Sequence, residues 1–380
     1  MYSEVFIWVT GASLACFLSY SSAFHITQPS SVRLSSTNLH LSSSSSISSS
    51  ISSSQNTKEI ADSDKKIRYR GRVAYNGSTF KGWQVQAKGR TVQGEIEQML
   101  SRRFDRQVKI VGAGRTDSGV HARGQAFHFD VYPEEAIINN ISDFNEVLQH
   151  DDDEQFCKKL QTSLNRMLPQ DIRVWNIQQC PPPVQVIKTI SSLSDGDDKE
   201  SSSIRIYNWH VIYNAKQKLY VYRINIGPQT ISTDPIERYT RVYVDGDIDV
   251  SYLQRILSYY EGTHDFRAFA GAIEANQRKD GVEHKNTVRT VHSVKLIDEG
   301  KGKYRIEILL KGALYKMVRN MVGTALDVCR GRLSEEYMLQ MLHHSDENNE
   351  NRQFVRKDNK CKPAPPEGLT LEWVYFDDDF

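Results

Sequence analysis

Apolar residues alternate with polar ones along several short stretches of the chain and recur at helical spacing along others. The alternating stretches predict strands at 68–75, 126–131, 172–177, 218–226 and 304–310, with a short strand at 108–111. The helical spacing predicts helices from Thr91 onward and over 157–167, 250–260 and 317–329. Because both halves of the chain mix strands with helices, the pattern predicts an α+β fold.

The predicted elements form two similar halves, which we assign to domains at 65–207 and 208–380. Neither half alternates strands and helices behind a glycine-rich first turn, and this excludes a dinucleotide-binding fold. Residues 181–206 contain a Pro-Pro-Pro run, a Ser/Asp run and few large apolar side chains. We therefore expect them to form a disordered insertion in the first domain.

The first 64 residues differ in composition from the rest of the chain. Residues 5–18 carry no charge, which suits the hydrophobic region of a signal peptide but is too short for a membrane span of about 20 residues. We assign 1–23 to a signal-peptide-like segment. Residues 1–4, ahead of the uncharged stretch, contain no Lys or Arg, so a poorly inserted membrane anchor stays open as an alternative. Residues 24–64 are Ser-rich, typical of a transit peptide or a disordered segment.

Together these two segments resemble the bipartite presequences of algae with complex plastids. The resemblance implies a transit peptide, delivery to a plastid and a mature protein without a membrane segment. Two alternatives stay open. The leader can direct secretion, or it can be a gene-model artefact on a cytoplasmic protein.

The distribution of charge changes the picture that the net charge gives. Among 380 residues, 48 are Lys or Arg and 47 are Asp or Glu, for a net charge of +1. The acidic residues gather in runs at 131–156, 195–200, 346–350 and 377–379, and outside these runs basic residues clearly outnumber acidic ones. A basic framework that carries acidic insertions fits an anionic partner such as a nucleic acid.

Metal and disulfide chemistry is not indicated. The five cysteines are widely spaced and form no C-x-x-C pair. His121 and His128 lie seven positions apart across a predicted strand, and His343-His344 lies in a polar segment, so neither pair forms a ligand set. We expect no metal and no cofactor.

One segment stands out for its chemistry, namely Gly114-Arg115-Thr116-Asp117-Ser118-Gly119 between two predicted strands. Its glycines allow a sharp turn that brings Asp117 to the apex of a loop. The nearby guanidinium of Arg115 favours the ionised carboxylate. From the residues alone, an Asp that only caps a turn explains the segment equally well.

This segment, extended through Val120-His121-Ala122, resembles the active-site motif of the tRNA pseudouridine synthase A family. Further motifs follow in the family's order across residues 66–376: Tyr75-Asn76-Gly77-Ser78-Thr79-Phe80-Lys81-Gly82-Trp83-Gln84, Thr91-Val92-Gln93-Gly94, Leu168-Pro169-Gln170-Asp171-Ile172, Arg289-Thr290, Met317-Val318-Arg319-Asn320-Met321-Val322-Gly323 and Glu367-Gly368-Leu369. The resemblance implies a pseudouridine synthase fold. Such a fold has two α+β, ferredoxin-like halves, a mixed and mainly antiparallel sheet, and a catalytic cleft between the halves.

The resemblance also implies the reaction and the partners. The family isomerises uridine to pseudouridine on the 3′ side of the tRNA anticodon stem-loop, without a cofactor and as a homodimer. It makes Asp117 the catalytic carboxylate, acting as a nucleophile or a base. It gives Tyr220 a place against the uracil ring, and it gives Arg115 the task of holding the flipped nucleotide.

Arg319 is expected to form an ion pair with Asp117. The resemblance implies this pair, and the local sequence supports it, because Arg319 is embedded among apolar residues where an unpaired charge is costly. Basic residues that are candidates for phosphate contacts are Lys81, Arg103, Lys216 and Lys218. Ile212 stands where the family usually has an Arg, which puts one RNA or structural contact in doubt.

Two other functions compete with this interpretation. An aspartic protease is suggested by Asp117-Ser118-Gly119, but such a site needs two carboxylates that share a proton, and the chain has one Asp-Ser-Gly. A catalytically silent RNA-binding homologue that keeps the fold is the second alternative. The presence of Asp117, Tyr220 and Arg319 together argues against it.

Overall fold

The computed structural model describes residues 66–137, 151–191, 200–227, 234–271, 286–343, 354–378 and 380. The described residues all belong to one compact unit, Lys58–Phe380. The signal-peptide-like segment at 1–23 and the Ser-rich segment at 24–64 lie outside the described residues. None of the helices in the described ranges is long and apolar enough to cross a membrane.

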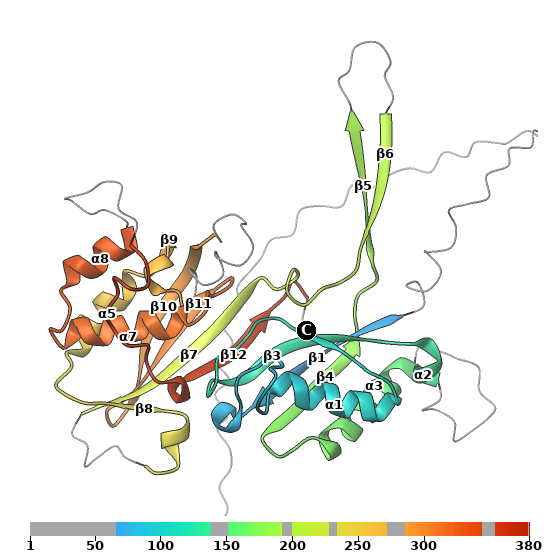
Figure 1. The fold of residues 1–380 in the computed structure, drawn as a ribbon, viewed down its shortest axis with the longest axis horizontal. Helices are drawn as coiled ribbons and strands as arrows, with labels where there is room; N and C mark the ends of the chain where they lie inside the picture. The colour runs from blue at the N-terminus through green and yellow to red at the C-terminus, as the bar shows by residue number, and fades with distance from the viewer. Residues whose placement is uncertain are drawn as a thin grey trace, which may run out of the picture. The chain divides into compact units, whose positions relative to one another are not determined.

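A ten-stranded mixed sheet runs through the compact unit in the order β4-β1-β3-β12-β7-β11-β10-β9 (Figure 1). Its strands are β1 (Ile67–Tyr75), β2 (Ile110–Gly112), β3 (His121–Val131), β4 (Ile172–Gln179), β7 (Gln217–Ile226), β8 (Val242–Val244), β9 (Gly262–Asp265), β10 (Val288–Gly300), β11 (Lys303–Leu310) and β12 (Leu369–Tyr375). Strand β2 pairs with β3, and β8 pairs with β7. The pairings are antiparallel except for β12 with β3 and β7 with β8, which confirms the predicted α+β fold with a mainly antiparallel sheet.

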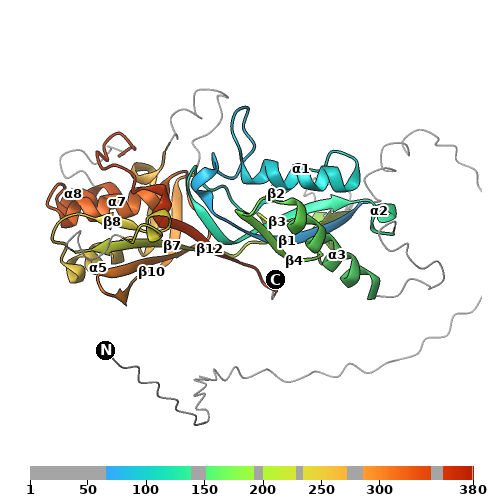
Figure 2. The same ribbon diagram turned by 90° about the horizontal axis from the view of Figure 1, so that it is seen from below.

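Strand β12 connects the two predicted halves of the chain. It runs parallel to β3, with Leu371 opposite Ala122, and antiparallel to β7, with Leu371 opposite Tyr220. Arg72 of β1 strengthens this junction, because its buried guanidinium lies 3.8 Å from the ring centre of Trp373 and donates to Val374 O at 2.9 Å. The sheet is therefore continuous across the predicted boundary between 207 and 208 (Figure 2).

The α-helices cover this sheet with their apolar faces. They are α1 (Val92–Phe104), α2 (Pro133–Ile137), α3 (Asp151–Met167), α5 (Val250–Ser258), α7 (Met317–Cys329) and α8 (Glu335–His343). Thr91 caps α1 as predicted, since its side chain accepts a hydrogen bond from Gly94 N. Helix α7 has the predicted bounds, and its apolar residues are buried in the core.

The predicted disorder at 181–206 is wrong for most of that segment. Strands β5 (Val184–Ser191) and β6 (Glu200–Tyr207) pair with each other in a two-stranded antiparallel sheet. Alternating β-branched residues in both strands favour this pairing over a disordered chain. The Ser/Asp run at 192–199 lies outside the described residues.

Candidate active site

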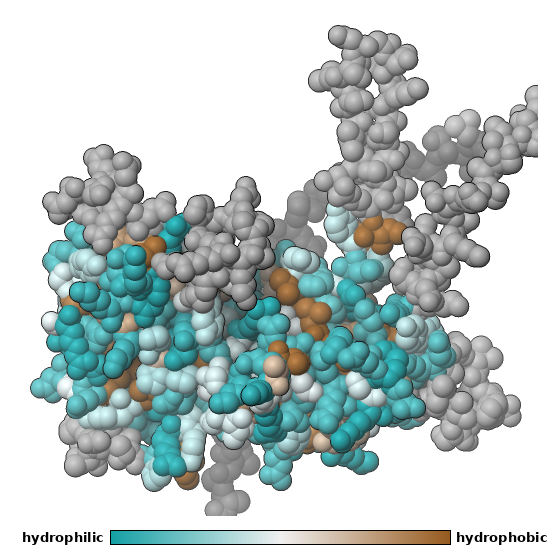
Figure 3. Space-filling view, viewed as in Figure 1, coloured by the Kyte–Doolittle hydropathy of each residue, from teal (hydrophilic) through white to brown (hydrophobic). Residues whose placement is uncertain are grey.

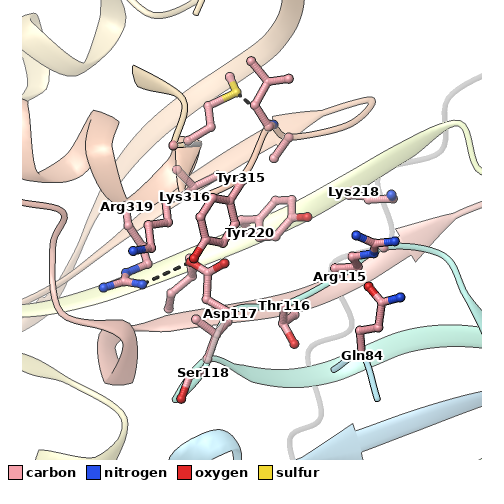
Figure 4. Close-up of a pocket in the computed structure, with 18 of the residues that line it drawn as sticks. Gln84, Arg115, Thr116, Asp117, Ser118, Lys218, Tyr220, Tyr315, Lys316 and Arg319 are labelled. Carbon is pink, nitrogen blue, oxygen red and sulfur yellow. Dashed lines mark hydrogen bonds and ion pairs between the residues drawn. The ribbon is translucent and has the colours of Figure 1, made fainter. Parts of the chain in front are cut away.

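A cavity of about 810 Å³ lies beside β12, where residues of both predicted halves meet (Figure 4). One wall comes from the loop between β2 and β3, which carries Asp117. A second wall comes from Lys218 and Tyr220 of β7. The third comes from residues 313–319, which lead from β11 into α7. The cleft that the family resemblance implied is thus present, and it contains all four expected site residues: Arg115, Asp117, Tyr220 and Arg319.

The loop that carries Asp117 rests on the loop that follows β1. Trp83 N donates to Thr116 O at 3.1 Å, and Ser118 Oγ donates to Phe80 O at 3.1 Å. Gly82 has a φ of +97°, and a Cβ at this position would lie 2.7 Å from Thr116 O. Only glycine fits this close backbone approach at positive φ, and this explains the Lys-Gly-Trp sequence in the motif after β1.

Buried side chains fix the loop from its inner side. The hydroxyl of Tyr75 and Oγ1 of Thr116 are 2.8 Å apart, and both residues are buried. Gln125 Nε2 donates to Gly114 O at 2.7 Å. The sequence motif that contains Tyr75 does not indicate a role for this residue, and the local sequence around Gln125 does not indicate one either. Their support of the loop depends on long-range contacts that no local pattern shows.

Asp117 and Arg319 form the ion pair that was expected. Arg319 Nη1 lies 3.0 Å from Asp117 Oδ2, and the two side chains are only 12% and 16% exposed. Arg319 Nε donates to Ala364 O at 2.7 Å, so a backbone carbonyl also orients the guanidinium. Partial burial makes a charge-assisted hydrogen bond of this kind stronger than a surface ion pair.

Arg115 lies on another side of the cavity. Its side chain is exposed and points toward Gln84 and Lys218, away from the Asp117–Arg319 pair (Figure 4). The cation that pairs with Asp117 is therefore Arg319, not the Arg115 that precedes it by two residues.

Tyr220 lies on β7 with its side chain in the wall of the cavity (Figure 4). The residue is 7% exposed. Burial, together with the negative charge of Asp117, raises the pKa of Tyr220 above its usual range. The hydroxyl is therefore protonated at neutral pH and is available as a hydrogen-bond donor.

Lys218, two residues before Tyr220, also lines the cavity. It is 8% exposed, and its Nζ donates to Ala113 O at 2.7 Å. Burial lowers the pKa of Lys218 to about 8. From the sequence, Lys218 is only one of several candidate phosphate contacts, because a strand pattern does not distinguish a buried lysine from a solvated one.

The lining of the cavity is strongly cationic. Its charged residues are Lys81, Arg115, Lys218, Lys316, Arg319 and the acidic Asp117. The described residues on the face shown in Figure 3 are mostly hydrophilic, with hydrophobic residues in small separate groups. A cavity with this excess of positive charge favours a polyanionic ligand.

The histidines and the aspartate do not form the sites of other enzyme classes. His121 Nδ1 accepts from Gly77 N at 3.0 Å, and His128 Nδ1 accepts from Val211 N at 3.2 Å, so both rings serve the fold. Across the described residues, no group of three or more His, Cys, Asp or Glu side chains is placed to hold a metal. Asp117 faces a guanidinium rather than a second carboxylate, and this does not fit an aspartic protease. Ile212 is 47% exposed and is not among the residues that line the cavity.

Comparison with known proteins gives a consistent result. A protein-family model described as "tRNA pseudouridine synthase" matches residues 72–167 and 256–377. The "tRNA pseudouridine synthase A 1" of Protochlamydia amoebophila is 30% identical over 314 residues, covering 82% of this chain and 97% of that protein. The "tRNA pseudouridine synthase A" of Latilactobacillus sakei is 32% identical over 311 residues, covering 81% of this chain and 98% of that protein. A solved structure, "Crystal Structure of a Cbf5-Nop10-Gar1 Complex", aligns with a TM-score of 0.27 at 8% identity, too weak a likeness to support an argument.

Proposed function

The chain belongs to the tRNA pseudouridine synthase family, and from that membership we propose that it isomerises uridine on the 3′ side of the tRNA anticodon stem-loop. The observation that carries this proposal is the ion pair of Asp117 and Arg319, held at 3.0 Å in a cavity whose other charged lining residues are all cationic. A carboxylate that pairs with a guanidinium beside a polyanion-binding surface suits chemistry on one nucleotide of an RNA.

The reaction moves the base without adding or removing any group. The bond between the base nitrogen and the ribose breaks, the base turns, and a new bond joins the ribose to a ring carbon. Asp117 is the catalytic carboxylate, acting as a nucleophile or a base, and Arg319 orients it. The Tyr220 ring offers a face on which the uracil stacks, and its protonated hydroxyl donates a hydrogen bond.

The target uridine must leave its stem before it reaches Asp117. Extrusion of a stacked base costs a few kcal/mol. Arg115 is exposed at the cavity and carries a charge that its neighbour Asp117 does not neutralise. We assign Arg115 to holding the extruded nucleotide.

Two further parts of the proposal concern the assembly and the location of the protein. We propose a homodimer in which each tRNA contacts both subunits. Sedimentation at micromolar concentration tests this assembly, and a result that shows only monomer would contradict it.

We also propose that residues 1–64 direct the protein to a plastid. A fluorescent protein fused after residue 64 tests this location. Secretion of the fusion protein, or fluorescence in the cytoplasm, would contradict delivery to a plastid.

Pseudouridine mapping on unmodified tRNAs tests the activity. The purified protein is compared with Asp117→Asn, which keeps the shape of the side chain, and with Asp247→Asn, which changes an exposed aspartate outside the cavity. We expect pseudouridine on the 3′ side of the anticodon stem-loop with the wild type and Asp247→Asn, and none with Asp117→Asn.

The other outcomes separate the parts of the proposal. Pseudouridine at a different tRNA position would correct the substrate and retain the activity. RNA binding without pseudouridine on any tRNA would favour the catalytically silent homologue. In that case Ile212, which replaces the usual family Arg, becomes the first residue to restore.

A further inference from the structure

Lys218 is a buried ammonium inside the cavity. Its Nζ donates one hydrogen bond, to Ala113 O, and two of its three donors remain for another partner. Within the described ranges, no carboxylate forms an ion pair with it. Burial of an unneutralised charge costs free energy, and the lowered pKa of Lys218 reflects that cost. An anion that enters the cavity would supply the missing negative charge.

The charges of the cavity are divided between two sides. Asp117 neutralises Arg319 on one side. Lys218 and Arg115 lie together on the other side, beside Gln84 (Figure 4). The positive charges of Lys218 and Arg115 therefore face a part of the ligand that does not contact the catalytic carboxylate.

The register of β7 relates Lys218 to the base. Lys218 and Tyr220 are two residues apart on one strand, so their side chains share a face at a spacing of about 7 Å. This spacing between the two side chains is comparable with the distance from a base to the phosphate of its own nucleotide. A uracil stacked on Tyr220 consequently places a backbone phosphate within reach of Lys218.

We infer that Lys218, together with Arg115, binds one of the two phosphates that flank the extruded uridine. The inference rests on the proposed function, since it identifies the ligand as RNA. A phosphate carries its full charge before the reaction begins, so Lys218 contributes to binding of the ground state. A contact to a uracil oxygen would instead strengthen only as negative charge develops on the detached base.

The first test changes the RNA and leaves the Lys218 side chain intact. Anticodon stem-loop RNAs with a single neutral methylphosphonate on the 5′ or the 3′ side of the target uridine are bound to the full chain carrying Asp117→Asn, which prevents turnover. We expect Kd to rise about 10- to 100-fold for one of the two positions, the usual value of a charge-assisted hydrogen bond. Small and equal changes at both positions would overturn the inference.

The second test changes the protein. Lys218→Met, in the same background, should weaken binding of the unmodified RNA by the same factor and cause no further loss with the sensitive methylphosphonate RNA. Lys158→Met is the matched control, because Lys158 is exposed, pairs with Glu154 at 2.5 Å and lies outside the cavity lining. Additive losses from Lys218→Met and the methylphosphonate would contradict a shared contact.

Two readouts keep the outcomes distinct. If Lys218→Met leaves Kd unchanged and lowers only the single-turnover rate of an otherwise wild-type chain, Lys218 contacts the base and the phosphate assignment is wrong. If Lys218→Met does not fold, as judged by circular dichroism, the comparison of Kd between the two methylphosphonate RNAs alone tests the phosphate contact. Wild-type turnover is measured separately, so absence of pseudouridine counts against the proposed function, while the Kd values still judge the phosphate contact.

Discussion

Asp117 and Arg319 are 202 residues apart in the chain, yet their side chains form the central contact of the cavity. Each depends on its own backbone support. The loop of Asp117 is supported through Thr116 and Ser118, and Arg319 is oriented by Ala364 O. The geometry of the carboxylate is thus determined by several separate parts of the fold.

Replacing Arg319 should impair catalysis more than folding. Arg319→Met removes the partner of a half-buried carboxylate, so we expect the single-turnover rate to fall about 10- to 100-fold, in line with a lost charge-assisted hydrogen bond. Arg319→Lys keeps the charge but lacks the separate Nε that donates to Ala364 O while Nη1 contacts Asp117, and it should recover part of the rate. A rate within twofold of wild type for Arg319→Met would show that the ion pair has no catalytic role.

A second residue-scale prediction concerns acid stability. Burial lowers the pKa of His128 from 6.5 to about 3, so between these values the unfolded chain binds a proton that the folded chain does not. The free energy of unfolding should therefore fall as pH falls from about 6.5 toward 3, by up to about 1.4 kcal/mol per pH unit.

His128→Asn isolates this effect, because an amide oxygen can accept the hydrogen bond from Val211 N without titrating. Urea unfolding at several pH values provides the measurement. The difference in stability between wild type and His128→Asn should change across the window, and a constant difference would rule out His128 as the source.

At the scale of elements, the local spacing of apolar residues was sufficient to predict those helices and strands that bury one regular face. Helix α7 has the predicted bounds, and β1 and β11 each begin one residue before the predicted strand, because their apolar spacing is regular. Strand β12 was not predicted, since its place is defined by β3 and β7 rather than by its own seven residues. The same limit applies to Lys218, whose burial results from long-range packing.

The hairpin of β5 and β6 should be dispensable for the stability of the rest of the unit. Its strands pair only with each other in a separate two-stranded sheet, and Val184 lies opposite Tyr207 where the hairpin begins. Replacing residues 184–207 with a short Gly-Ser linker should therefore shift the unfolding midpoint by only a few degrees. Calorimetry measures this, and a loss of the cooperative transition would show that the hairpin supports the sheet.

At the scale of the whole molecule, β12 should make the two predicted halves unfold together. Leu371 is fully buried and lies in the ladders to both β3 and β7. Leu371→Pro removes a ladder donor and distorts the junction, so the variant should be less stable than the wild type. We expect one calorimetric transition in the wild type and a lower single transition in the variant. Two separate transitions would indicate that the halves are stable independently.

The late position of β12 in the sequence also affects how the protein is made. Arg123 on β3 and Glu372 on β12 form an ion pair at a sequence separation of 249, so this contact waits for nearly the whole chain to leave the ribosome. Contacts of such high sequence separation form slowly, because a long loop must close first. Until then the part of β3 around His121 and Ala122 lacks its β12 partner, and unpaired strand edges of this kind favour aggregation. An incomplete translation product also lacks the strand beside which the walls of the cavity meet, so we expect it to be inactive on RNA.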